Sequence, residues 1–132
     1  MEEQIRSYQK ILKNNPLDVP AFTALEELYL GEDRWEDLVQ LYQQRIAHSA
    51  DSGQQLGLLV KCAGVVHHRL GNVGLAQDLY RRILALDVHN RTALDGLAEL
   101  YRKQGDWRQL ALILEQMALM SADAVERADL FS

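Results

Sequence analysis

The sequence predicts an all-α fold, a right-handed solenoid in which antiparallel helix pairs stack one after another. Two observations predict it: the chain matches itself at a fixed offset, and its apolar residues recur at the three- and four-residue spacing of amphipathic helices. The composition agrees, because 48% of the 132 residues are hydrophobic, 25% are charged and only two are proline. Such a composition is typical of a folded domain with long helices.

The self-match lies at an offset of 72 residues. It aligns Trp35 with Trp107, the two tryptophans of the chain, and it aligns the tripeptide Ser-Ala-Asp at 49–51 with the same tripeptide at 121–123. So many coincidences at one offset are not expected by chance. We therefore interpret the offset as an internal repeat, which is the sequence signature of a stacked architecture.

The repeat divides further into units of 34 residues. Residues 57–90 and 91–124 align as adjacent units, and residues 19–52 form an earlier one. A four-residue insertion at 53–56 accounts for the rest of the 72-residue offset. These alignments predict a single solenoid over residues 1–132.

The two ends of the chain look like parts of further units. Residues 1–16 have the pattern of the second helix of a partial repeat, and residues 125–132 have that of the start of a further helix. Terminal repeats normally carry a polar capping face, and neither end clearly does. We hypothesise that the chain belongs to a longer array, or that its ends are covered by a partner or a second copy.

Each unit is predicted to contain two helices. Ala76, Leu79, Tyr80 and Ile83, for example, share one face of a helix. The Gly-Asn pair at 71–72 supplies a glycine that ends one helix and a polar residue that begins the next. The predicted helices cover residues 2–14, 18–31, 34–48, 55–70, 73–86, 90–104, 107–120 and 123–132.

The third unit carries Leu94, Leu97, Ala98 and Tyr101 in its first helix, followed by Gly-Asp-Trp at 105–107. These residues resemble the tetratricopeptide repeat family, whose 34-residue unit is a helix–turn–helix. The resemblance covers nearly all of the chain, and the alternation of two unit types is similar to long bacterial arrays of divergent repeats. The closing proline of the family pattern is replaced at Ala50, Val88 and Ala122.

The resemblance implies a non-catalytic protein–protein interaction module or assembly scaffold. In tetratricopeptide arrays the first helix of each unit lines a concave groove, so outward residues on those helices are candidate partner-binding residues. They are Thr23, Glu27, Leu30, Lys61, Cys62, Val65, His68, Arg69, Asp95, Glu99, Arg102 and Lys103. The cations among them suit carboxylates on a bound peptide. The alternative is that they are solvated charges near helix C-termini, where a cation is favoured by about 0.3–1 kcal/mol.

Two other functions stay open. The first is structural self-association through uncapped repeat ends, which would give a homo-oligomer. The second is a regulatory or targeting arm of a larger protein. An enzyme is not expected, because the sequence contains no phosphate-binding loop and no Gly-x-Ser-x-Gly motif.

The charge pattern favours a protein or peptide partner over nucleic acid. The formal net charge is −5, whereas phosphate binding requires a basic surface. Residues 18–37 contain seven acids and one base, whereas residues 61–108 contain eight bases and five acids, so an acidic partner would suit the second segment. No apolar stretch approaches the roughly 20 residues of a spanning helix, so no membrane insertion is expected. The N-terminus lacks a signal peptide pattern, which favours the cytoplasm, with the periplasm open if the chain comes from a longer secreted protein.

No cofactor or metal site is expected from the histidines and the single cysteine. His67 and His68 are adjacent, so on a helix they point about 100° apart and do not chelate one ion easily. His67 occupies the column of Tyr29 and Tyr101, which predicts a packed histidine. Cys62 has no histidine on its own helix face, which predicts a small residue facing the groove or a neighbouring helix.

The two tryptophans begin second helices at the same column of the repeat. Trp35 and Trp107 are therefore predicted to pack against the turn inside their hairpins, and not to bind a ligand.

Overall fold

The computed structural model describes the backbone of residues 1–131 and the side chains of residues 1–121. Within residues 1–131 the chain forms helices and no strand. They are α1 (Glu2–Asn14), α2 (Val19–Gly31), α3 (Trp35–His48), α4 (Ser52–Val65), the π-helical turn η1 (Val66–Leu70), α5 (Val73–Leu86), α6 (Arg91–Gln104) and α7 (Trp107–Phe131).

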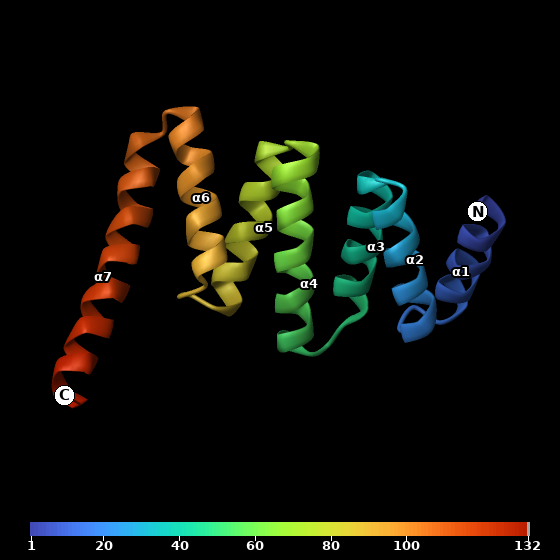
Figure 1. The fold of residues 1–132 in the computed structure, drawn as a ribbon, viewed down its shortest axis with the longest axis horizontal. Helices are drawn as coiled ribbons and strands as arrows, with labels where there is room; N and C mark the ends of the chain where they lie inside the picture. Colours follow the sequence, from blue (N-terminus) through green and yellow to red (C-terminus); the bar gives the residue numbers. More distant parts are fainter. Residues whose placement is uncertain (132) are drawn as a thin grey trace.

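The helices stand side by side in chain order, from α1 at one end of the molecule to α7 at the other (Figure 1). Each helix packs against the next one along the chain. An α-helical solenoid is built in this way, since each hairpin buries its apolar face only against its neighbours. The prediction of an all-α solenoid of antiparallel helix pairs is therefore confirmed.

Short polar side chains begin several of the helices. The carboxylate of Asp18 accepts a hydrogen bond from the backbone N–H of Ala21 at 2.9 Å, and the side chain of Asn90 accepts one from Ala93 at 3.0 Å. Asp51 and Asn72 cap α4 and α5 in the same way. Each cap satisfies an N–H that has no partner inside the helix, which stabilises the helix start by about 1 kcal/mol.

A residue in the left-handed backbone conformation ends the first helix of each of the three hairpins. Gly71 (φ 63°) and Gly105 (φ 73°) do so as expected. In the first unit this conformation falls on Asp33 (φ 54°), and Gly31 is still helical. The predicted turn lies at the right place there, but a different residue supplies the left-handed conformation.

Two predicted helix boundaries are wrong. The helix predicted for 55–70 begins at Ser52, so the insertion at 53–56 adds helix to α4 and not loop. The break predicted between 107–120 and 123–132 is absent, because α7 runs without interruption to Phe131. Residues 125–131, predicted to start a further helix, belong to α7, and Ser132 lies outside the described residues.

The core follows the repeat columns. Leu25, Ala63 and Leu97 occupy one column of the first helices and are all buried. Between units, the ring of Tyr80 on α5 lies directly over Gly96 on α6. Tyr42 is buried in the same column of α3. The stacking between units thus uses an aromatic residue of one hairpin against the first helix of the next.

The tryptophans begin α3 and α7, as the repeat alignment requires, but their surroundings differ. Trp35 is half-buried, with the guanidinium of Arg69 lying 5.0 Å above its ring. Trp107 is 65% exposed. The prediction that Trp107 packs against its turn is therefore wrong. The physical reason is that Arg69 belongs to the hairpin after Trp35, whereas no hairpin follows α7 within residues 1–131.

Candidate functional site

The predicted partner-binding residues lie on the first helix of each hairpin, and we call their surface the first-helix face. Most of them are exposed, and Val65 and Glu99 are half-buried. Thr23 and Glu27 are on α2; Lys61 and Val65 are on α4; His68 and Arg69 are on η1; and Asp95, Glu99, Arg102 and Lys103 are on α6.

Five of the residues predicted from the sequence line one shallow cavity between α2 and the α4–η1 segment. The cavity has a volume of about 560 Å³. Its lining includes Leu30, Lys61, Val65, His68 and Arg69, together with other apolar or aromatic side chains that sequence reasoning did not assign to the site, Trp35 among them. The residues on α6 and the α2 pair Thr23 and Glu27 are not among the lining.

Some of the predicted basic residues already have carboxylate neighbours. The ammonium of Lys61 lies 3.5 Å from Glu26, and that of Lys103 lies 3.1 Å from Glu99. The Lys103 hydrogen bond is the largest cause that lowers the pKa of Glu99. The Lys103–Glu99 pair is largely exposed and contributes about 0–1 kcal/mol, so a partner's carboxylate can replace Glu99 at little cost. In the other pair the side chain of Glu26 is only 16% exposed.

Two arginines on this face, Arg69 and Arg102, have no carboxylate within 4 Å among residues 1–121, and neither has the imidazole of His68. Arg69 is held in place by its stacking on Trp35. A stacked guanidinium keeps its hydrogen-bond donors available while losing little side-chain freedom on binding. Arg69 is therefore the best-positioned cation of the face.

Cys62 was predicted to face either the groove or a neighbouring helix; its placement among the outward residues is wrong, and the second alternative is the one that the structure supports. Its side chain is fully buried, and that burial raises the pKa of the thiol to about 11. Cys62 occupies the repeat column of Gly96, where a first helix packs against the preceding hairpin. A buried thiol with a raised pKa is chemically inert, so no nucleophilic role follows.

One polar contact at the cavity was missed. The hydroxyl of Tyr42 donates a 2.6 Å hydrogen bond to the carboxylate of Glu26. Burial first, and then this carboxylate, raise the pKa of Tyr42. Glu26 replaces the small residue found in the same column at Gly64 and Ala98, and that substitution was the sequence signal for this contact.

His67 is packed, as its column predicted. Its side chain is buried, with Nδ1 in a 2.7 Å hydrogen bond with the hydroxyl of Tyr80. Its Nε2 has no hydrogen-bond partner among the described residues, and the nearest carboxylate oxygen, on Glu99, is 3.7 Å away. The ring also stacks on His68. Burial, followed by the nearby His68, lowers the pKa of His67 below its ordinary value of 6.5.

The lowered pKa predicts that acidification destabilises the chain. Below about pH 6.5 the histidine is protonated in the unfolded chain but stays neutral in the folded one. The free energy of unfolding therefore decreases as the pH is lowered, until the pH reaches the pKa of the folded state. The variant His67→Tyr should remove this dependence, since it places in this column the tyrosine found there in the other two units. The hydroxyls of Tyr29 and Tyr101 accept hydrogen bonds from Gln9 and Arg81 of the preceding helix. Gln43 holds the equivalent position on α3 and can donate to the new tyrosine. Urea unfolding at several pH values between about 8 and 5 measures it.

The matched control for that experiment is His48→Gln, since His48 is an exposed histidine on α3. Its stability should follow the wild-type pH dependence. The lowered pKa of Glu99 also makes stability fall with acidification, but that loss is centred on a lower pH range than the loss due to His67. An unchanged pH dependence in His67→Tyr would show that another group is responsible.

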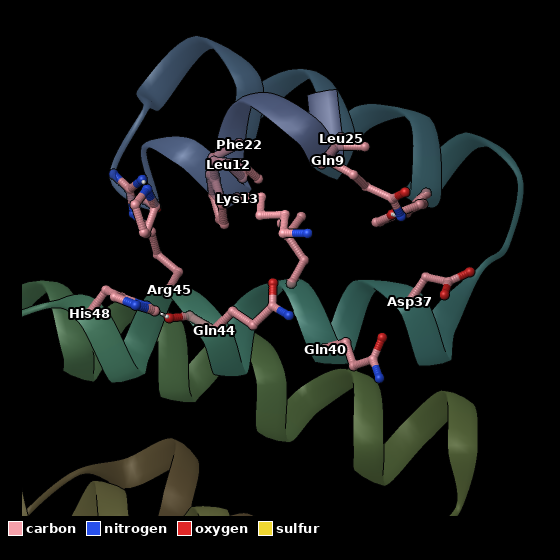
Figure 2. Close-up of a pocket in the computed structure, with 13 residues that line it drawn as sticks. Gln9, Leu12, Lys13, Phe22, Leu25, Asp37, Gln40, Gln44, Arg45 and His48 are labelled. Atoms are coloured by element: carbon pink, nitrogen blue, oxygen red, sulfur yellow. Dashed lines mark hydrogen bonds between the residues drawn. The ribbon is translucent and has the colours of Figure 1, made fainter. Parts of the chain in front are cut away.

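A second and more enclosed cavity lies between α1, α2 and α3, with a volume of about 430 Å³ (Figure 2). Sequence reasoning did not predict it. Its sequence signal was Arg45, which interrupts the apolar stripe of α3.

Among the residues that the structure describes, no three histidine, cysteine or acidic side chains are grouped to hold a metal ion. None of the described helices combines the length and the apolarity needed to cross a bilayer.

The family model for the tetratricopeptide repeat matches residues 21–56 and 93–124, which together make up just over half of the chain. With its solenoid of helical hairpins, the chain belongs to the tetratricopeptide repeat family. Repeats of this family generally mediate protein–protein interactions and are typically not catalytic. No protein with a curated description matches the sequence significantly.

Proposed function

We propose that the chain binds a partner protein or peptide on its first-helix face, as an interaction module or an assembly scaffold. The observation that supports this most directly is the cavity between α2 and the α4–η1 segment, where apolar and cationic side chains lie together. A binding surface of this kind gains affinity from the apolar contacts and orientation from the charges.

The chemistry of the face favours an acidic segment that also carries an apolar side chain. Leu30, which is 44% exposed, and the half-buried Val65 and Trp35 offer apolar contact. Arg69 and Arg102 offer guanidinium groups without a carboxylate partner within 4 Å among the described residues. Asp95 and Glu99, in contrast, would select against a uniformly acidic ligand close to α6, where Asp95 lies 3.2 Å from Arg91.

The test is selection of random peptides on the immobilised intact protein, followed by affinity measurement for the best binders. The double variant Arg69→Glu/Arg102→Glu should weaken binding of acidic peptides by at least about tenfold, which corresponds to ~1.4 kcal/mol. The control Arg108→Glu reverses an exposed charge at the start of α7, away from this face, and should leave the affinity unchanged. Circular dichroism verifies that all variants keep their helix content.

The location of binding is checked by NMR titration of the wild type with the same peptides. Perturbed amide signals should concentrate on α2, α4, η1 and α6. Trp35 at the start of α3 should also be perturbed, because it lines the cavity. Perturbations centred on α5 and α7, or equal affinities of the double variant and the wild type, would contradict the assignment of the binding surface to the first helices.

A further inference from the structure

The cavity between α1, α2 and α3 is lined by different residues from those of the first-helix face, and it combines an apolar surface with basic side chains (Figure 2). Its apolar floor consists of Leu12 from α1, Phe22 and Leu25 from α2, and Leu41 from α3. Its basic side chains are Lys13, Arg45 and His48. Figure 2 shows Arg45 and His48 at one end of α3 and Asp37 at the other.

The repeat explains why this unit has a cavity. In the next unit the columns of Leu12 and Arg45 hold Ile46 and Ile83, and both isoleucines are buried and fill the space. In the third unit the column of Arg45 holds Met117. A guanidinium cannot be buried unpaired in an apolar core, so it stays at the edge and leaves the floor open.

Arg45 is positioned but not neutralised. Its guanidinium lies 5.0 Å above the ring of Phe22 and makes one long hydrogen bond, 3.5 Å, to the carbonyl oxygen of Pro16. Among the described residues no carboxylate lies within 4 Å of Lys13, Arg45 or His48. The acid that lines the cavity, Asp37, is instead bonded to Arg34 at 2.7 Å.

We propose that this cavity binds a carboxylate carried on an apolar body. The carboxylate lies beside Arg45, which offers a planar fork of donors, and the body of the ligand covers the apolar floor. The volume of about 430 Å³ is in the range of small-molecule sites, so it accommodates a group the size of an aromatic amino acid. Gln40 and Gln44 on the rim supply amide donors and acceptors for the polar part of the ligand.

The same chemistry comes from two sources, a free organic acid or the C-terminal residue of a peptide. NMR titration of the full chain with N-acetylphenylalanine and with N-acetylalanylphenylalanine distinguishes them. Equal affinities identify a free acid as the ligand class, and tighter binding of the dipeptide identifies a peptide C-terminus; either result supports the proposal. Perturbed signals should lie on α1, α2 and α3.

The C-terminal amides of both probes test the role of the charge. Each amide should bind at least about tenfold more weakly than its acid, a difference of ~1.4 kcal/mol. The variant Arg45→Met should weaken both acids by a similar factor and leave the amides unchanged. Because Met117 occupies the same column of the repeat, this variant is expected to fold, and its thermal unfolding verifies that.

Two further variants complete the design. Arg45→Lys keeps the charge and should retain part of the affinity for the acids, while Arg108→Met removes an exposed arginine at the start of α7, outside the cavity, and should retain all of it. Equal affinities for acids and amides would overturn the proposal, as would unchanged binding of the acids by Arg45→Met. Absence of saturable binding of both acids to the wild type would also overturn it.

Discussion

Gly96→Ala is expected to destabilise the chain by about 2 kcal/mol, although alanine is the better helix former by about 1 kcal/mol. Gly96 lies inside α6, and a Cβ atom there would lie only 2.3–2.8 Å from three ring carbons of Tyr80 on α5. Tyr80 is buried, so its ring cannot move away without disturbing the packing between the two units. Urea unfolding followed by circular dichroism measures the loss.

The matched control is Gly57→Ala in α4. Gly57 is exposed in a helix interior, and a Cβ atom there meets nothing within 4 Å. Alanine at this position should stabilise the chain by about 0.4–1 kcal/mol through the lower entropy of the unfolded state. If Gly96→Ala gained stability as well, the close approach of α5 and α6 would be absent in solution.

Leu79→Ala should have the larger effect, a loss of about 2–5 kcal/mol in the free energy of unfolding. Leu79 is 1% exposed on α5, which packs against both α4 and α6. Removing its side chain leaves a cavity at the centre of the stack. Because each hairpin is stabilised by its neighbours, this cavity should also separate the unfolding of the two ends, giving a broader transition.

Leu112→Ala provides the comparison, since it deletes the same atoms from a side chain that is 50% exposed on α7. Its effect should stay within about 0.5 kcal/mol. A similar loss in both variants would mean that α5 is not an interior helix of the solenoid. Thermal unfolding measured by circular dichroism gives both values in one series.

The fold was largely predictable because its signals are local and recur in each unit. Asp18, Asn72 and Asn90 begin helices at predicted positions, since a short polar side chain satisfies the first free N–H groups wherever an apolar stripe comes next. His67 was correctly predicted as packed, because it shares a column with Tyr29 and Tyr101. Predictions of this kind need only the sequence neighbourhood and the repeat.

The candidate sites were less predictable, because they depend on which residues meet across helices. The column of Cys62 was read as outward, but that side chain is buried where α4 packs against the preceding hairpin. The cavity at Arg45 needed the positions of three helices, although the interruption of the stripe was visible in the sequence. Trp107 shows the same limit, since its exposure depends on whether another hairpin packs beside α7 and not on its own column.

The tripeptide Ser-Ala-Asp separates the features that the sequence alone determined from those that the tertiary structure decided. The sequence determined that residues 49–51 and 121–123 occupy equivalent places in a repeat. At 49–51 the chain leaves the helix, and Asp51 caps α4, which packs against α3 and α5. At 121–123 the same three residues continue α7 as helix. The three residues therefore do not decide by themselves whether the chain turns. The residues that follow them differ, Ser-Gly at 52–53 and Ala-Val at 124–125, and within residues 1–131 only the first site is followed by a helix that packs back on the preceding one.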